Sequence, residues 1–338
     1  MRDVYFSPAI RLRANRVERA ATLVRLWLRR PDLLWSILSI EGAPSKLRYK
    51  ARWLDLASRM LRPLCCIAWD VEQKVARIVD HYSVTRRLGG ILTPVWSYDA
   101  RELLGLAEIG PQYSVKIDEP DWLTNDGLVT ISLWHGIDRM FALTFLLSQE
   151  PGPLTAYVGG LQGRGSGAAP QTYKQMTKDA HGMRPRDLTI EISRMFFKAI
   201  GASRIHAVAE MARNWNDRFA DEEFHYIASL DYDQAWEERG GKRINSNWFR
   251  LPLDAQRRDE NDIPARKRSL YRQRYAMLDA IERSMVEAVA RLVPGSNNKP
   301  GAPLPMPLTP RMRSRPAGNK AKAAFFVLAA ATFAWLAD

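Results

Sequence analysis

The sequence predicts an α+β protein in which helices flank a mixed β-sheet, and two periodicities carry this prediction. Three stretches alternate apolar and polar residues, as strands that bury one face do: 128–135, 139–148 and 154–162. From Pro185 to Ile200 the apolar residues recur at every third and fourth position, which is the period of an amphipathic helix. A further strand-like piece follows at 204–209. Hairpin, third strand, helix and fourth strand are therefore expected to form one α/β unit.

The first hundred residues are expected to form an N-terminal helical region packed on the sheet. Four stretches have helical patterns or an apolar, helix-like composition: 20–28, 33–40, 46–61 and 71–88. The pair Arg62-Pro63 separates the third of these stretches from the fourth, because the residue before a proline avoids the helical conformation. We therefore place a domain boundary at residues 100/101 and a second domain at 101–292.

Turn residues divide the second domain. The regions 89–94 and 118–127 carry glycine, proline and asparagine, and Asp126-Gly127 suits a tight entry into the first strand of the hairpin. After residue 209 we expect a polar helix or loop to 221, an aromatic and mixed region at 224–236, and a strand at 248–253. Residues 262–292 return to a helical pattern and are expected to form a C-terminal helix.

The end of the chain differs in composition from the rest. Residues 293–322 are rich in proline and basic, without an acidic residue, and this predicts a disordered linker. Residues 323–338 form a short apolar tail that is too short for an ordinary membrane span. Its basic flank suits weak association with anionic lipid, and the alternatives are a helix docked on the domain or a disordered end.

The charge of the chain points toward acidic partners but not strongly. The formal net charge is +13 over 338 residues, and basic proteins favour phosphates, nucleic acid or anionic lipid. Seven Lys and Arg residues and one acid lie from Arg291 onward, so this segment alone contributes +6. The remainder carries an ordinary basic surface for its size.

The cysteines and the N-terminus indicate a reducing compartment. Only Cys65 and Cys66 are present, and their adjacency resembles neither a disulfide framework nor a zinc site, so no metal is expected. Arginines interrupt the N-terminal residues where a secretory signal would need an apolar run. We expect a cytoplasmic protein, with peripheral binding at the inner membrane left open. No P-loop and no Ser-His-Asp order stands out.

A glycine-rich turn after the third predicted strand is the first candidate binding element. It reads Gln162-Gly163-Arg164-Gly165-Ser166-Gly167, and glycines let backbone amides approach an anion. The pattern Gln-x-x-Gly-x-Gly between a strand and a helix resembles the acyl-CoA pyrophosphate loop of GNAT-type N-acyltransferases. The resemblance covers roughly residues 128–253 and implies an acyl-CoA cofactor held at Gln162, Gly163, Gly165 and Gly167. About twenty residues are expected between this loop and the next helix, where the acyltransferase pattern has none.

The start of the helix at Pro185 is the second candidate. Proline suits the first helical position, where its missing N–H costs nothing. Arg184 and Arg186 lie in this first turn and Lys178 shortly before it, although the helix dipole disfavours cations there. An anionic ligand near Arg184 would account for them, with Lys178 and Arg186 as further contacts. The alternative is that the arginines pair with Asp179, Asp187 or more distant acids.

Several distinctive motifs occur in order along the chain. They are Leu161-Gln162-Gly163, Thr177-Lys178, His181-Gly182-Met183-Arg184-Pro185, Tyr232-Asp233-x-x-Trp236-x-Glu238-x-Gly240-Gly241, Leu251-Pro252, and Arg266-Lys267-Arg268-Ser269-x-Tyr271-Arg272-x-Arg274-Tyr275. On these motifs the chain resembles the bacterial VirK/YbjX family from about residue 45 to 292. Members are associated with virulence and envelope stress, and the domain has no agreed activity. Met183, where leucine is expected, and Gly165-Ser166-Gly167 are minor departures.

Acid–base residues are the remaining candidates for chemistry. Glu210 ends the fourth predicted strand, where a transferase cleft would open, and His181 lies beside the candidate helix start. These two are the predicted catalytic bases. Tyr226, Asp231, Asp233 and Glu238 are weaker candidates, because each is more easily a structural group.

The functional hypothesis is therefore an acyl-CoA-dependent N-acyltransferase of the VirK/YbjX type. The alternative is a noncatalytic basic regulator that binds nucleic acid or an envelope partner. Its best segment is 266–274, whose arginines could contact phosphates or form a plain solvated helix face.

Overall fold

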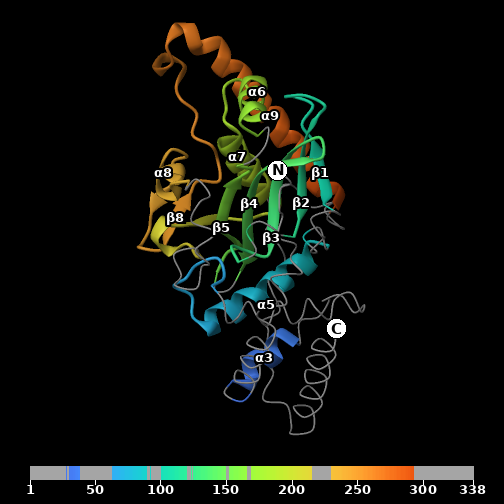
Figure 1. The fold of residues 1–338 in the computed structure, drawn as a ribbon, viewed down its shortest axis with the longest axis vertical. Coiled ribbons are helices and arrows are strands. Elements are labelled where there is room, and N and C mark those ends of the chain that lie inside the picture. Colours follow the sequence, from blue (N-terminus) through green and yellow to red (C-terminus); the bar gives the residue numbers. More distant parts are fainter. Residues whose placement is uncertain are drawn as a thin grey trace, which may run out of the picture. The chain divides into compact units, whose positions relative to one another are not determined.

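The computed structural model describes residues 28, 30–38, 63–89, 92, 100–119, 123, 125–149, 152–165, 169–214 and 230–292. The chain divides into two compact units, one of residues 1–62, 70–82 and 306–338 and the other of residues 63–69 and 83–305. The second unit contains the sheet (Figure 1). The predicted boundary at 100/101 stays a prediction.

The second unit is α+β and is built on an eight-stranded mixed sheet. The strands are β1 (Arg101–Gly105), β2 (Tyr113–Asp118), β3 (Val129–His135), β4 (Asp138–Ser148), β5 (Thr155–Gly163), β6 (Arg204–Val208), β7 (Lys242–Arg243) and β8 (Trp248–Leu251). Their order across the sheet is β1-β2-β3-β4-β5-β6-β8-β7. Every neighbouring pair is antiparallel except β5 and β6, which are parallel.

The predicted hairpin is confirmed as β3 and β4. Gly136, at a φ of +58°, and Ile137 connect the two strands, and glycine suits the positive φ that such tight turns require. Both faces of these central strands are buried. On the less apolar face, Thr130 and Thr144 bond to each other with 3.0 Å between hydroxyls. The hairpin thus forms the centre of the core.

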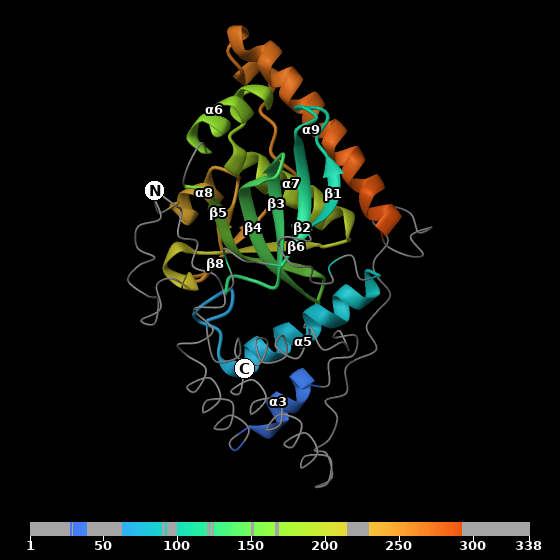
Figure 2. The ribbon, with the colours of Figure 1, turned by 45° about the vertical axis from the view of Figure 1, so that its right-hand side comes forward.

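Helices cover one face of the sheet. α7 (Pro185–Ala199) packs on β3, β4 and β5, and α9 (Ala265–Leu292) packs on α7 and β1 (Figure 2). The ring of Phe145 on β4 lies 4.8 Å from that of Phe197 on α7, centroid to centroid. The predicted helices 185–200 and 262–292 are confirmed, and so are the strands near 154–162, 204–209 and 248–253.

Five helices and strands were absent from the sequence-based prediction: β1, β2, β7, α6 (Ala169–Asp179) and α8 (Tyr232–Glu237). Tyr113, Val115 and Ile117 alternate along β2 and are buried, so a strand signal was present there. α6 buries only Ala169 and Met176 and carries little apolar signal. Its presence corrects the expectation that twenty residues without a helix follow the glycine-rich turn, because α6 begins soon after β5.

The first unit contributes two described helices, α3 (Pro31–Leu38) and α5 (Val71–Arg87), although α5 extends into the second unit by its last turn. They confirm most of the predicted stretches 33–40 and 71–88. The predicted helices 20–28 and 46–61, the linker 293–322 and the tail 323–338 lie outside the described residues, apart from Leu28. Across the described helices, none has the length and apolar composition that crossing a membrane requires.

Candidate functional site

The parallel strands β5 and β6 separate partway along their length. They pair from Thr155 with Arg204 to Val158 with Ala207. β6 ends at Val208, whereas β5 continues to Gly163 along β4. A bulge lies at the point of separation, because Thr144 of β4 pairs with Gly160 and Phe145 with Val158, leaving Gly159 as the extra residue. Bulges bend a strand and end its pairing on one side. Among the described strands, none pairs with the edge of β5 beyond Val158.

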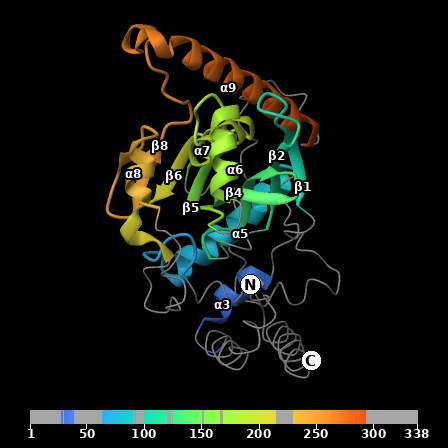
Figure 3. The same cartoon turned by 45° about the horizontal axis from the view of Figure 1, so that its top comes forward.

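α8 lies beside β8 (Figure 3), and two of its side chains bond to the separated strands β5 and β6. The hydroxyl of Tyr232 accepts a hydrogen bond from the backbone N–H of Leu161 and donates to its carbonyl. The indole N–H of Trp236 donates to the carbonyl of Val208, at 2.9 Å. Both aromatic side chains are fully buried. One side chain of α8 thus forms hydrogen bonds with backbone groups of β5, and another does so with the backbone at the end of β6.

Polar residues gather beside Tyr232, where β6 ends. The carboxylate of Glu210 accepts from Arg213 Nη1 at 2.9 and 3.1 Å and from the backbone N–H of Tyr232 at 3.0 Å. The guanidinium of Arg213 stacks on the Tyr232 ring, 3.7 Å from its centroid. Asp233 Oδ1 accepts from the backbone N–H of Glu210. Glu210, the first predicted base, is therefore already held by several donors.

Asp126 and Asn214 complete this group. The side-chain amide of Asn214 donates to Asp126 Oδ1 at 2.9 Å and also to the carbonyl of Asn125. Asp126 packs on the bulge, since a Cβ added to Gly160 would lie 2.8 Å from its Oδ2. We call Asp126, Glu210, Arg213, Asn214 and Tyr232 the splay cluster. Cys65, at a φ of +61°, adjoins it through its N–H bond to the carbonyl of Asn125.

Burial raises the pKa values of two acidic groups in the splay cluster. It raises the pKa of Asp126 to about 6, against the opposing effects of the Asn214 hydrogen bond and the Arg213 charge. Burial also raises the pKa of the Tyr232 hydroxyl well above its usual range. A carboxyl that titrates near neutral pH can both accept and release a proton under physiological conditions, which is what a general base or acid needs.

The predicted phosphate loop is partly in the strand. Gln162 and Gly163 belong to β5. Arg164 pairs with Asp138, and the Tyr173 hydroxyl of α6 lies 2.9 Å from the Arg164 carbonyl. No atom lies within 4 Å of a Cβ built on Gly165, so the backbone is open there. Gly167 lies outside the described residues. The turn is thus anchored at Arg164 and open at the next residue.

The predicted cations at the start of α7 have different environments. Pro185 is the first helical residue, as predicted, and Arg184 is the N-cap without a side-chain cap. Arg184 and Lys178 are exposed. Arg186 bonds to Asp187 at 2.8 Å and to Glu238. Burial lowers the pKa of Arg186, but the two acids together raise it above its ordinary value. For Arg186 the structure therefore shows the ion-pairing alternative.

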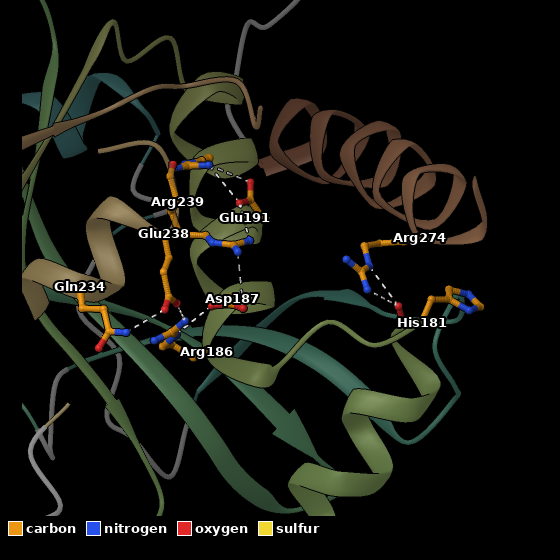
Figure 4. Close-up of polar contacts among 9 residues, drawn as sticks. His181, Arg186, Asp187, Glu191, Gln234, Glu238, Arg239 and Arg274 are labelled. Atoms are coloured by element: carbon orange, nitrogen blue, oxygen red, sulfur yellow. Dashed lines mark hydrogen bonds and ion pairs between the residues drawn. The ribbon is translucent and has the colours of Figure 1, made fainter. Parts of the chain in front are cut away.

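An ionic network continues from Arg186 along α7 (Figure 4). Arg194 Nη1 lies 3.0 Å from Glu191 Oε1, and both side chains are almost fully buried. Arg239 lies 3.7 Å from Asp187 and 3.8 Å from Glu191. Burial lowers the pKa of Arg194. This network fastens α7 to the segment after α8.

His181, the second predicted base, forms the corner between α6 and α7. Its φ is +49°, and Gly182 follows at +78°. Its carbonyl accepts from Arg274 Nε at 3.0 Å and Nη2 at 2.8 Å. In Figure 4 its ring points away from Arg186 and Glu238. Glu210 and His181 thus lie in different surroundings, Glu210 in the splay cluster and His181 at the α6–α7 corner; their catalytic roles stay predictions.

Sequence reasoning missed Asp126, Arg213 and Asn214. The sequence identifies Asp126 correctly as a turn residue before glycine. No sequence pattern predicts its contact with Asn214. Only the pairing of β3, β4 and β5 places the turn before β3 against the bulge of β5. These contacts depend on long-range register, which single-sequence patterns do not contain.

Part of the chain is similar to bacterial proteins that are described as uncharacterized. An uncharacterized protein of Haemophilus influenzae is 28% identical over 203 residues, which are 60% of this chain and 64% of that protein. The uncharacterized protein YbjX of Escherichia coli is 34% identical over 144 residues, 42% of this chain and 43% of its own length. The chain therefore spans under two thirds of each of these relatives. No solved structure matches.

The family assignment rests on a longer match. Residues 15–287 match the family described as protein of unknown function DUF535. This range contains the whole sheet, α7 and the splay cluster. The chain belongs to the DUF535 family, to which the resemblance to VirK/YbjX proteins pointed.

Proposed function

We propose that the protein is an acyl-CoA-dependent N-acyltransferase that works at the separated strands β5 and β6. The observation that carries the proposal is the edge of β5 beyond Val158, which no described strand covers and which is followed by the open turn at Gly165 and by α6. This strand, turn and helix order is the one in which the GNAT resemblance expects an acyl-CoA.

The open edge suits an extended chain that carries amide groups, as the arm of CoA does. Peptide groups of alternate residues point to the same edge of a strand, so those of Gly163 lie on the edge that Leu161 presents to Tyr232. An extended partner can bind at an open strand edge by forming hydrogen bonds with the backbone groups there, as an additional strand would. Gly163 is the next such position after Leu161, and no hydrogen bond joins it to the described residues of α8.

The phosphates of the cofactor would lie over the turn after β5. Gly165 leaves its backbone accessible, and the exposed side chains of Lys178 and Arg184 supply positive charge at the same end of the sheet. Arg184 remains the proposed anion clamp, since it has no ion pair within the described part of the chain. Arg186 is excluded from this role by its own acids.

In the proposed reaction, the lone pair of an acceptor amine attacks the thioester carbonyl carbon. The C–N bond forms, the C–S bond breaks, and the sulfur leaves with the electron pair and is protonated to CoA thiol. The proton lost by nitrogen passes to a carboxylate of the splay cluster, either Glu210 or Asp126. Positioning of the two substrates supplies most of the rate in such a reaction.

Calorimetry with the full chain and acetyl-CoA or longer acyl-CoAs tests the proposal. Saturable binding is expected, and Arg184→Ala should weaken it at least fivefold. Arg283→Ala, which removes an exposed arginine from the later part of α9, is the matched control and should bind as the unmodified chain does. The transferase proposal would be contradicted if no acyl-CoA bound. It would also be contradicted if Arg184→Ala and Arg283→Ala lost the same amount of acyl-CoA affinity.

The alternative, a nucleic-acid-binding regulator, is favoured by one surface. Arg274 stacks 4.5 Å above Tyr271, and Arg258 lies 6.0 Å from the same ring. Arg266, Lys267 and Arg272 are exposed beside them on the first half of α9. Interleaved cations and aromatic rings bind nucleic acid without sequence preference. A steep loss of RNA or DNA affinity with salt, reduced by Lys267→Ala, would support this function instead.

A further inference from the structure

The splay cluster contains a buried acceptor atom that lacks a donor. Asn214 is only 8% exposed, and its amide oxygen has no hydrogen-bond partner in the described part of the chain. The amide nitrogen on the same carbon is fully used, because it donates to both Asp126 and the carbonyl of Asn125. A buried polar atom without a partner is costly and uncommon in folded proteins. Asn214 is thus held in an orientation that keeps one acceptor available beside Asp126.

Asp126 supplies a second acceptor at the same place. Its carboxyl has one side-chain hydrogen bond, from Asn214, and forms no ion pair with a described residue. The other carboxylates nearby are paired, Glu210 with Arg213 and Asp233 with Arg243. Asp126 retains partial exposure to solvent. Asp126 thus forms no ion pair with a described residue, although the charge of Arg213 acts on its pKa.

The geometry points to a binding site for a small primary amine, whose ammonium group donates one N–H to Asn214 Oδ1 and another to the Asp126 carboxylate. An ammonium carries three donors and no acceptor, which matches two acceptors without a donor. An anion is excluded because both groups would repel it. A divalent metal is a poorer fit, since two side-chain oxygens fall short of the coordination that Ca²⁺ or Mg²⁺ takes.

This site opposes the general electrostatics of the chain. A net charge of +13 repels cations from most of the surface, so nonspecific binding of an amine is disfavoured. Saturable amine binding would therefore report a local site. The inference stands apart from acyl transfer; where the transfer occurs, it names the acceptor as a primary amine bound at Asp126 and Asn214.

Titration of the full chain with benzylamine and with spermidine, followed by calorimetry at pH 7.5 and constant ionic strength, tests the site. Saturable binding is expected for at least one of them, and Asp126→Asn should weaken it at least tenfold. Asn214→Ala should weaken it severalfold. Asp254→Asn is the control for loss of one negative charge, because Asp254 is exposed and pairs with Lys198 away from the splay cluster; it should bind as the unmodified chain does.

The affinity should also rise with pH between 5 and 7, as the carboxyl loses its proton, and Asp126→Asn should abolish this rise. Circular dichroism of each variant shows whether it is folded, and the pH dependence in the unmodified chain needs no variant at all. No saturable binding of either amine, or unchanged binding by folded Asp126→Asn, would overturn the site. Because no acyl-CoA is present, failure here is distinct from failure of the transferase.

Discussion

The hydroxyl of Tyr232 bonds to both backbone groups of Leu161, so that one side chain of α8 takes the place of a neighbouring strand on β5. Parallel pairing with β6 ends at Val158, and the next peptide groups on that edge would be buried without partners. Such groups cost free energy when they are left unpaired. The hydrogen bonds from Tyr232 of α8 therefore permit β5 and β6 to separate without leaving these groups of Leu161 unpaired.

Tyr232→Phe removes both hydrogen bonds to Leu161 and keeps the packed ring. Because the N–H and carbonyl of Leu161 would then be buried and unpaired, we expect the free energy of unfolding to fall by about 1–3 kcal/mol. Urea unfolding followed by circular dichroism measures it. Tyr275→Phe is the control, since its hydroxyl accepts one bond from the exposed backbone N–H of Arg258. Equal effects of the two substitutions would contradict the role given to Tyr232.

Asp126 should make stability depend on pH. Its pKa is raised to about 6 in the folded protein, above the ordinary value of 3.8. For an acid with a raised folded pKa, the stabilisation is complete below about pH 4 and is lost as the pH rises through 6. In Asp126→Asn the residue does not titrate, so the variant does not lose this stabilisation as the pH rises. We expect the variant to gain roughly 1–3 kcal/mol relative to the unmodified chain between pH 4 and pH 7.

Unfolding at a series of pH values from 4 to 8 measures this difference. Only the change with pH is used, so a constant offset caused by the substitution itself does not matter. Glu282→Gln, at a more exposed carboxylate that pairs with Lys198, is measured in the same way for comparison. A difference that stays flat across the range would show that Asp126 titrates normally.

Because Glu191 and Arg194 form a buried ion pair, replacing one of them should lower the free energy of unfolding more than replacing both. Glu191→Gln leaves the Arg194 guanidinium uncompensated in the interior, beside Arg239. We expect a loss of about 3–5 kcal/mol in unfolding free energy. The double variant Glu191→Gln with Arg194→Met removes both charges and should recover part of this. Lys198→Ala, in an exposed pair, should cost about 0–1 kcal/mol.

The same pair shows where sequence reading reaches its limit. Periodicity identified α7 from its apolar residues, but Glu191 and Arg194 read as the solvated side of that helix. They are buried because the segment after α8 covers that side, with Arg194 donating to the carbonyl of Arg239. Local patterns likewise identified β3 to β6 and α9. They failed for α6, whose residues are mostly polar, and for Asp126 and Asn214, which meet only through the register of the sheet.

Gly159 should tolerate no side chain. A Cβ there would lie 2.2 Å from the carbonyl oxygen of Asp126 and 2.8 Å from the Cα of Cys65, and both are backbone atoms that cannot turn aside. Gly159→Ala should therefore destabilise the protein by about 1–3 kcal/mol or more. Gly105→Ala, where a Cβ meets no atom within 4 Å, is the matched change in another strand. Thermal unfolding of the two variants compares them, and similar midpoints would contradict a close contact at the bulge.

His181 gives the last prediction, because its backbone and its ring suggest different roles. A φ of +49° is unfavourable for a residue with a side chain, and glycine adopts it freely. The bonds from Arg274 reach the His181 carbonyl and do not involve the ring. His181→Gly should therefore keep the corner and raise the unfolding free energy by up to about 1 kcal/mol. His181→Val should lower it by a similar amount or more, since β-branched residues fit this conformation worst.

The matched change is Gly182→Ala, at a φ of +78° and with a Cβ that would lie 2.9 Å from Arg274 Nη2. It should destabilise the corner and weaken any anion binding at Arg184, which lies two residues on. If His181 were instead the base of the proposed transfer, His181→Gly would keep the fold and lose the activity. A stable His181→Gly variant with full acyl transfer places proton removal in the splay cluster, whereas a stable and inactive one returns it to His181.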